Sequence, residues 1–190
     1  QETRQLRPLM PPEGVVHMKC IIGFIVLAGC SVTASAELVG SYTVGSGASS
    51  SQLLFQFTNT NSYFYEIRYD GALFGDDLLA IAAAAQPGFF SYQVKSFSFG
   101  DALLSVSIGA DVDTGFGNPP DYLDYWHYWT KELGDTAWTE SFVGFGDRAI
   151  SNGSWDGWVF NSAAAPMAVP TPGVLAVMAL AGSLRRRSRA

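Results

Sequence analysis

Short stretches in which apolar and polar residues alternate recur through the middle of the chain, residues 37–162, which we call the body. The clearest is YFYEIRY, residues 63–69, where aromatic or apolar residues hold every second position and the charged residues fall between them. A period of two is that of a β-strand with one buried face and one wet face. β-Branched and aromatic runs between turn residues predict further strands at 38–44, 52–57, 90–97, 102–108, 122–130, 137–142, 149–150 and 155–160.

A loop rich in Gly and Ser, residues 45–51, separates the first two predicted strands. These are typical turn residues, and strands joined by a short turn usually pair with each other. We therefore expect strands 38–44 and 52–57 to form a β-hairpin.

The body contains one strong helix pattern, which predicts a helix over Asp76–Gln86. Asp76 and Asp77 can cap the free N–H groups of the first turn and favour the positive end of the helix dipole. The alanines that follow have the highest helix propensity, and Pro87-Gly88 ends the helix. Since capping explains the carboxylate pair, we assign it no catalytic role.

One early helix among several strands predicts an α+β fold, a β-rich single domain with one packed helix. The 190 residues, of which 48% are hydrophobic and 15% charged, suit one globular domain once targeting segments are set aside. No internal repeat appears. A linker rich in Ala and Pro, residues 163–169, follows the body.

All five tryptophans lie between residues 126 and 158. In the stretch 125–129 a period of two leaves aromatic rings on both faces, so this strand is either covered on both sides or presents one face to a ligand. Flat rings can stack on sugars, and core packing is the alternative. The candidate ligand-binding residues are Trp126, Trp129, Trp155 and Trp158.

The body is strongly acidic, with fifteen Asp and Glu residues, four Lys and Arg residues and a formal charge of −11, within a chain of net charge −6. Such a field repels phosphate backbones, which excludes nucleic acid as a partner and leaves cations open. The two cysteines, Cys20 and Cys30, lie upstream of the body, so disulfide and thiol chemistry are excluded from it.

The body has one histidine, His127, and no constellation of residues that predicts catalysis. Zinc sites need three or four protein ligands, and nucleophile triads need a recognisable nucleophile beside a base, so neither is predicted. We therefore expect no enzyme activity. Two acids that meet in space could still hydrolyse glycosides, and an enzyme acting on extracellular polysaccharide is the alternative.

Aspartates between residues 109 and 124 are the candidates for a metal site. Asp111 and Asp113, with Asp121 and Asp124 nearby, could supply oxygen ligands to calcium. Their spacing lacks the glutamate that closes an EF-hand loop, and solvated loop carboxylates are the alternative. No other cofactor is indicated.

The region before the body has the pattern of a secretory signal peptide, residues 18–36. One lysine precedes an apolar run that ends at Gly29, and the small residues Ala34 and Ala36 mark a cleavage site for signal peptidase. Residues 1–17 show no periodicity, and we interpret them as a mis-called extension upstream of the initiator, Met18.

A second interpretation of this region concerns Cys30. The residues Leu-Ala-Gly-Cys that end there match a bacterial lipobox, in which the cysteine is lipidated and becomes the mature N-terminus. Cleavage after Ala36 and lipidation at Cys30 are therefore alternatives.

The last residues, 170–190, combine three parts: Pro170-Thr171-Pro172, an apolar run over 173–184 and an arginine cluster. The apolar run has twelve residues, whereas a membrane-spanning helix needs about twenty. Arginines favour the cytoplasmic side, so the run predicts a short hydrophobic helix that is held only transiently in the inner membrane. The arginines are Arg185, Arg186, Arg187 and Arg189.

This order of parts resembles the PEP-CTERM sorting signal of Gram-negative bacteria, in a Pro-Thr-Pro variant with Thr171 where the family name has Glu. The resemblance implies recognition by an exosortase, a membrane processing enzyme. It also implies release to the cell surface or the extracellular matrix, in bacteria that produce exopolysaccharide.

Residues 63–160 resemble the β-grasp-like modules of the transcobalamin C-terminal type. The shared pattern is a helix after an early strand and a late Gly turn, here Asn152-Gly153, before an aromatic final strand. This resemblance implies a module that binds a small molecule or a glycan, although fold does not determine function.

Together these patterns predict a secreted surface or matrix protein whose body is a non-catalytic module, structural or binding a ligand or glycan. The expected partners are signal peptidase, an exosortase-type enzyme and exopolysaccharide.

Overall fold

The computed structural model describes residues 36–98 and 100–167. The chain divides into two units, 1–33 and 34–190, and the described residues all belong to the second. The predicted signal segment up to residue 35, including Cys30, and the predicted sorting signal with its short helix lie outside the described residues. Among residues 36–98 and 100–167, no helix has the length and apolarity needed to cross a membrane.

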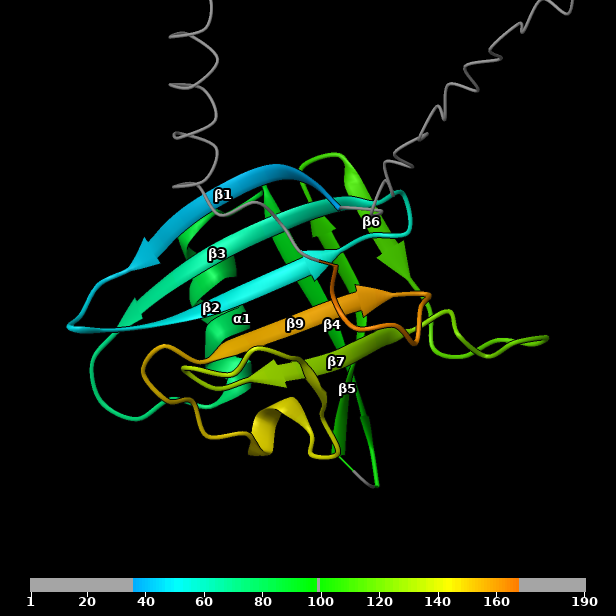
Figure 1. Ribbon diagram of the computed structural model, residues 1–190. Helices are drawn as coiled ribbons and strands as arrows, with labels where there is room; N and C mark the ends of the chain where they lie inside the picture. The colour runs from blue at the N-terminus through cyan, green and yellow to red at the C-terminus, as the bar shows by residue number, and fades with distance from the viewer. Residues whose placement is uncertain (1–35, 99, 168–190) are drawn as a thin grey trace, which may run out of the picture. The chain divides into compact units, whose positions relative to one another are not determined.

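The described residues form a large mixed sheet, a small antiparallel sheet and one α-helix (Figure 1). The large sheet has the order β1-β3-β2-β9-β7-β8, and the small one β4-β5-β6. This confirms the predicted β-rich domain with one early helix. The elements are β1 (Glu37–Gly45), β2 (Ser49–Gln56), β3 (Asn61–Tyr69), α1 (Gly75–Ala85), β4 (Phe90–Phe97), β5 (Gly100–Ile108), β6 (Asp111–Thr114), β7 (Trp126–Lys131), β8 (Thr139–Glu140), the 3-10 helix η1 (Phe145–Asp147) and β9 (Trp155–Phe160).

Six of the predicted strands agree with the structure to within three residues at each end: β1, β2, β3, β4, β5 and β9. In β3 the expected faces are confirmed, because Tyr65 and Ile67 are fully buried and Arg68 is exposed. β7 begins four residues later than predicted, and β8 is shorter than predicted. The stretch 149–150 contributes only an isolated bridge between Ala149 and Phe74. β6 was not predicted from the sequence.

The predicted hairpin of the first two strands is wrong, because β3 lies between β1 and β2. β1 runs parallel to β3, and β2 runs antiparallel to it. The connecting loop crosses the end of β3, where the Ala48 N–H donates to Asp70 Oδ1 at 2.9 Å. Gly47 is needed at this crossing, since a Cβ there would lie 2.1 Å from the carbonyl carbon and oxygen of Tyr69. A Gly/Ser loop of this length fits a hairpin or a crossing equally well, and pairing with β3 decides between them.

The helix prediction is confirmed to within one residue. Asp77 accepts a hydrogen bond from the Phe74 N–H at 2.8 Å, so this carboxylate stabilises the first turn as expected. The apolar side of α1 faces the core. Leu78, Leu79 and Ala82 on that side are fully buried.

The inner face of the large sheet packs against α1 and the small sheet, which lie side by side behind it (Figure 1). Large apolar side chains from all three parts meet in one core. They include Leu53, Phe55, Tyr65 and Ile67 from the large sheet, Leu78 and Leu79 from α1, and Phe90, Leu103, Val106 and Ile108 from the small sheet.

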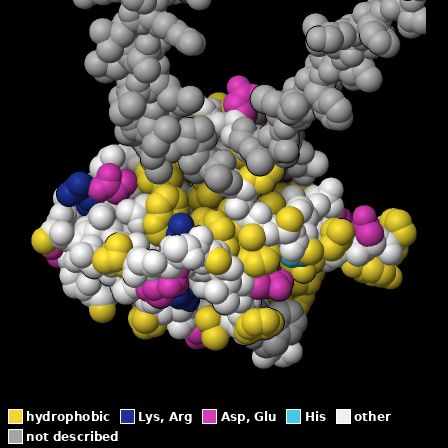
Figure 2. Space-filling model, viewed as in Figure 1, with side chains coloured by type: hydrophobic (Ala, Val, Ile, Leu, Met, Phe, Trp, Pro, Cys, Tyr) yellow, Lys and Arg dark blue, Asp and Glu magenta, His cyan; other side chains and the backbone are white. Residues whose placement is uncertain are grey.

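The outer face of the large sheet is partly covered by the start of the predicted linker. Apolar side chains gather near the middle of this face (Figure 2), and Pro166 and Met167 contact residues of β9 and β2 on it. The buried Gln56 donates from Nε2 to the Met167 carbonyl at 3.0 Å and accepts from the Met167 N–H at 2.9 Å. Pro166 is buried over Gly157, where a Cβ would lie 2.8 Å from its Cγ. The described part of the linker is therefore docked on the body.

Candidate functional site

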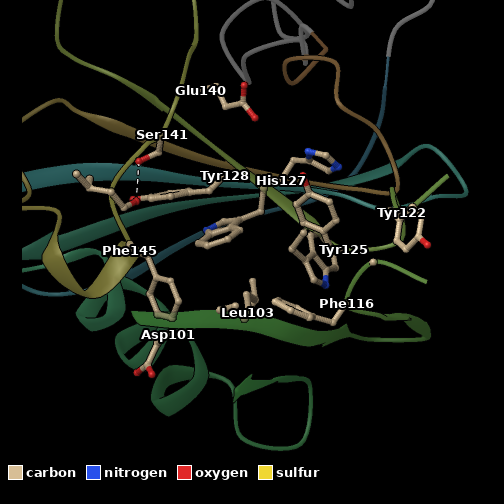
Figure 3. A pocket seen from close by; sticks show the side chains of 16 residues that line it. Asp101, Leu103, Phe116, Tyr122, Tyr125, His127, Tyr128, Glu140, Ser141 and Phe145 are labelled. Carbon is tan, nitrogen blue, oxygen red and sulfur yellow. Dashed lines mark hydrogen bonds between the residues drawn. The ribbon is translucent and has the colours of Figure 1, made fainter. Parts of the chain in front are cut away.

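A cleft with a volume of about 450 Å³ opens beside β7, on the side that faces β5 (Figure 3). β8 pairs with β7 only through Trp129 and Thr130, so the rest of this edge of β7 has no strand beside it. Side chains from residues 125–128, from the loops on either side and from the start of β5 line the cleft. A short edge strand thus leaves room for a ligand between the two sheets.

Aromatic rings on the inner face of β7 and β9 form the wall of the cleft. Trp126 and Trp158 are 4% and 3% exposed, respectively. Tyr128 stacks on Trp158 with ring centroids 4.3 Å apart, and Phe145 meets Trp158 edge-on at 5.5 Å. These contacts hold the rings in place, so the wall is formed before any ligand arrives.

Further rings lie at the mouth of the cleft. Tyr122 is 58% exposed and Phe116 is 36% exposed. Tyr125 stacks on His127 with ring centroids 3.8 Å apart. These side chains offer flat apolar faces, and the tyrosines add hydroxyl groups.

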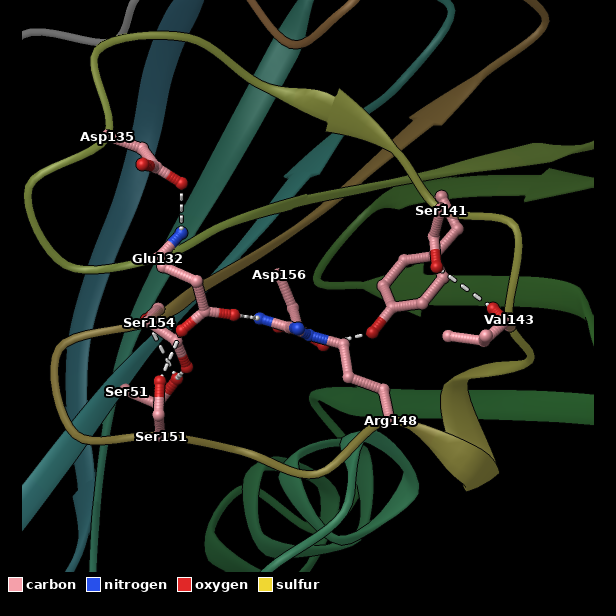
Figure 4. A network of polar contacts seen from close by, with 10 residues as sticks. Ser51, Glu132, Asp135, Ser141, Val143, Arg148, Ser151, Ser154 and Asp156 are labelled. Carbon is pink, nitrogen blue, oxygen red and sulfur yellow. Dashed lines mark hydrogen bonds and ion pairs between the residues drawn. The ribbon is translucent and has the colours of Figure 1, made fainter.

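A buried polar network supports the wall from behind (Figure 4). The Tyr128 hydroxyl donates to Asp156 Oδ2, and Arg148 Nε donates to Asp156 Oδ1 at 2.9 Å. Burial raises the pKa of the Asp156 carboxyl, against the opposing effects of Arg148 and Tyr128. Burial is the main cause that raises the pKa of Tyr128, and the charge of Asp156 is the next. The phenol therefore stays protonated and donates a hydrogen bond to Asp156. The network fixes the orientation of Tyr128 in the cleft.

Arg148 extends the network to the surface. Its Nη2 lies 3.0 Å from Glu132 Oε1, and Glu132 in turn accepts a hydrogen bond from Ser151. The Arg148 carbonyl accepts from the Gly75 N–H at 3.0 Å. One arginine thereby connects the start of α1, the loop after β7 and the strand β9.

Two carboxylates, Asp101 and Glu140, lie at the rim of the cleft. Figure 3 shows them on opposite sides of it, with the aromatic side chains between them. This placement differs from two carboxylates that face a common bond, the arrangement glycoside hydrolysis needs.

His127 is 3% exposed, and its ring stacks on Tyr125. Burial lowers the pKa of His127 below its ordinary value, while the Leu123 backbone and the Glu140 charge oppose this effect. The imidazole is therefore neutral at neutral pH. In the part of the chain that the structure describes, no group of three His, Cys, Asp or Glu residues could hold a metal ion.

The four tryptophans predicted as ligand-binding residues lie on both faces of the large sheet. Trp126 and Trp158 line the cleft. Strand alternation places Trp129 on the outer face. Trp155 contacts Trp138 there, with ring centroids 6.0 Å apart, and Lys131 Nζ lies 4.5 Å from its ring. The structure thus brings two of the four together in one site.

The rings at the mouth, Phe116 and Tyr122, were not predicted as site residues. Both lie in the loop between β6 and β7, where Tyr122 was predicted as the first residue of a strand and Phe116 as part of no element. The only available signal was the presence of aromatic residues in a loop rich in Gly and Pro.

The candidate calcium ligands hold the two sheets together. Asp111 accepts hydrogen bonds from Asn59 Nδ2 at 2.7 Å, Asn61 Nδ2 at 2.9 Å and the Tyr63 hydroxyl at 2.7 Å. Asp113 accepts from the Thr58 N–H at 2.8 Å. In this structure the carboxylate oxygens of Asp111 and Asp113 therefore accept hydrogen bonds from N–H and O–H groups. We call Asp111 and Asp113 with their partners the inter-sheet clasp.

The remaining two aspartates of the predicted cluster lie elsewhere. Asp124 accepts hydrogen bonds from the backbone and side chain of Asn118. Asp121 is exposed in the same loop. Neither belongs to the clasp.

No protein-family model matches the chain, and no curated protein or solved structure is significantly similar to it. The site therefore has to be interpreted from its own geometry.

Proposed function

We propose that this protein is a secreted bacterial surface or matrix protein whose body binds a glycan chain without cleaving it. The observation that carries this proposal is the cleft at the free edge of β7, with held rings in its wall and exposed rings at its mouth. Sugar rings present C–H faces that pack on aromatic rings, and their hydroxyl groups bond to polar rim groups. The resemblance to transcobalamin-type β-grasp modules, which implies ligand binding, agrees with this function.

Binding to glucose and N-acetylglucosamine oligomers, followed by tryptophan fluorescence, tests the proposal. Tyr125→Ala and Tyr122→Ala each remove one ring from the mouth, and we expect about three- to tenfold weaker binding from each. Trp155→Ala is the matched control, because it removes a ring from the outer face. Weakening by Trp155→Ala alone contradicts a site in the cleft.

Incubation of the same oligomers with the protein separates binding from hydrolysis. Retention with no new reducing ends is expected for a binding module. Release of reducing ends supports the alternative, an extracellular polysaccharide-acting enzyme, and Asp101→Asn and Glu140→Gln then show whether the rim carboxylates take part.

The sorting function belongs to the same proposal. The order of Pro170-Thr171-Pro172, a twelve-residue apolar run and an arginine cluster supports processing by an exosortase-type enzyme after secretion. The body would be tethered to the inner membrane for a short time and then released to the surface or matrix.

Intact-mass measurement of the native protein tests this part. We expect a chain that begins at residue 37, or at a lipidated Cys30, and that lacks the arginine cluster. Deletion of 170–190 is expected to abolish correct sorting. A mature chain that retains Arg185–Arg189 contradicts the proposal.

A further inference from the structure

The two carboxylates at the rim of the cleft have no partner of their own. Among the described residues, Asp101 and Glu140 accept no side-chain hydrogen bond and form no ion pair, whereas Asp111, Asp124 and Asp156 are all hydrogen-bonded. Both rim residues are exposed. Their charges are therefore available to a ligand in the cleft.

The basic side chains of the described residues are all engaged. Arg148 contacts Asp156 and Glu132, and Arg68 Nη2 lies 2.8 Å from Glu66 Oε1. The lysines lie over aromatic rings: Lys131 Nζ is 4.5 Å from Trp155 and 4.9 Å from Trp138, and Lys95 Nζ is 5.1 Å from Phe97 and 5.8 Å from Phe116. None of these four residues lines the cleft, and Lys95, which lies over the ring of Phe116 at the mouth, is the cation that the Lys95→Gln variant below removes.

The wall also contains an unused hydrogen-bond donor. Trp126 Nε1 is buried and has no partner, and Trp126 lines the cleft. Because this nitrogen is not accessible from the cleft, the ring of Trp126 offers a ligand its apolar face and not its N–H.

From these contacts we propose that the cleft selects a glycan with positively charged groups, that is, an amino-sugar chain that carries free ammonium groups. This inference builds on the proposed glycan-binding function and names its ligand class. The rings pack on the sugar faces, the two rim carboxylates pair with ammonium groups, and a body with a charge of −11 attracts the chain from solution. An ammonium group also interacts favourably with the face of an aromatic ring.

The test compares three oligomers of similar length on the full chain: glucosamine, N-acetylglucosamine and a uronic acid. The measurements are made at about pH 5.5 and at low salt, where interactions between exposed charges are screened least. We expect glucosamine to bind at least about tenfold more tightly than N-acetylglucosamine, because each carboxylate contributes about fivefold. We expect no measurable binding of the uronic acid. The preference for glucosamine should decrease at about 1 M salt, which screens charges beyond about 3 Å.

Substitutions of the two rim carboxylates test whether these side chains cause the preference for glucosamine. Glu140→Gln and Asp101→Asn should each reduce the preference for glucosamine about fivefold and leave the affinity for N-acetylglucosamine unchanged. Glu66→Gln is the matched control, since it removes one charge from β3, three strands away from β7 in the sheet, and should change neither affinity. Lys95→Gln tests the cation that lies over Phe116 and should not weaken binding.

The possible outcomes distinguish this inference from the proposed glycan-binding function on which it rests. Equal binding of glucosamine and N-acetylglucosamine, unaffected by the rim variants, overturns the inference and leaves glycan binding in place. Preferred binding of the uronic acid, lost in Lys95→Gln, also overturns it. Failure of all three oligomers to bind contradicts glycan binding itself, and the inference with it.

Discussion

Asp111 shows how one carboxylate can link two layers of a fold. It lies on β6 in the small sheet and accepts three hydrogen bonds from residues of the large sheet and its turn. Asp156 has a comparable role within the large sheet, where it joins Tyr128 to Arg148. Hydrogen bonds to charged groups are stronger than those between neutral groups, so both residues carry more of the stability than most polar residues.

We predict that Asp111→Ala lowers the free energy of unfolding by about 1–3 kcal/mol at neutral pH, because it leaves three donors without their acceptor. Burial tends to raise the pKa of Asp111, but hydrogen bonds from Tyr63, Asn61 and Asn59 together lower it. A lowered pKa in the folded state means that this stability is present above the unfolded pKa of about 3.9 and is lost as pH falls through the folded value.

Urea unfolding of the wild type and Asp111→Ala at neutral pH and at about pH 3 measures this effect. The difference in unfolding free energy between the wild type and Asp111→Ala should be smaller at the lower pH. Asp121→Ala, which removes an exposed aspartate, should change stability by less than about 0.5 kcal/mol. A constant difference at all pH values contradicts the role assigned to the clasp.

We predict that Asp156→Ala costs about 3–5 kcal/mol of unfolding free energy, because it leaves the buried Arg148 charge without its closest partner. The surface pair Arg68–Glu66 provides the comparison. Glu66→Ala should cost no more than about 1 kcal/mol, since exposed ion pairs contribute little. Chemical denaturation of both variants measures the two values, and similar losses argue against a special role for the buried network.

At the scale of whole elements, the crossing loop between β1 and β2 determines the order of strands in the large sheet. The loop has to pass over the end of β3 so that β3 can pair with both neighbours. The backbone of Gly47 approaches Tyr69 too closely for any other residue.

Gly47→Ala should therefore destabilise the protein by about 1–3 kcal/mol, because a Cβ there forces the loop away from β3. Gly71→Ala is the matched control: Gly71 also has a positive φ, of 82°, but a Cβ there would meet nothing within 4 Å. Its cost should be about 1 kcal/mol or less. Thermal unfolding compares the stability of the two variants. Equal losses of stability would show that the close approach of Gly47 to the Tyr69 backbone is unimportant.

At the scale of the whole molecule, the segment that follows the last strand docks on the outer face of the large sheet. The side-chain amide of Gln56 donates to the Met167 carbonyl and accepts from the Met167 N–H, and Pro166 covers Gly157. The chain toward the predicted sorting signal therefore leaves the body from a defined position.

We expect Gln56→Ala to release residues 163–167 from the sheet, because both of the hydrogen bonds that hold Met167 are lost. Limited proteolysis with mass spectrometry should show faster cleavage in this segment. Gln52→Ala is the control on the same strand and the same face, since Gln52 Oε1 is buried but has no hydrogen-bond partner. If both variants are cut at the wild-type rate, the amide contacts do not hold the segment.

The strands and the helix could be predicted because their signals act over a few residues. Alternation defines β3, aromatic and β-branched residues after a Gly turn mark β9, and the early aspartates, the alanines and Pro87 define α1. β6 could not be predicted in the same way, because its four residues, DVDT, are half-buried or exposed and include two charges. Its pairing with β5 and the clasp depends on contacts with distant parts of the chain.

The candidate site was predicted only in part. Trp126 and Trp158 were identified because aromatic residues are concentrated in β7 and β9. Strand alternation puts Trp155 and Trp158 on opposite faces, but the sequence could not show which of the two faces the cleft, because β9 has no buried side and wet side to distinguish. Nor could it place Asp101 and Tyr122, which reach the cleft from separate elements.

The sequence by itself determined the positions of most strands, the single helix, the acidic character of the body and the predictions for the two ends of the chain. Only the tertiary structure decided the strand order, the role of Asp111 as part of a clasp and the existence of a cleft beside β7. The physical reason is the range of the forces involved. Periodicity and capping depend on neighbours a few residues away, whereas strand pairing and cleft formation depend on which distant segments exclude water together.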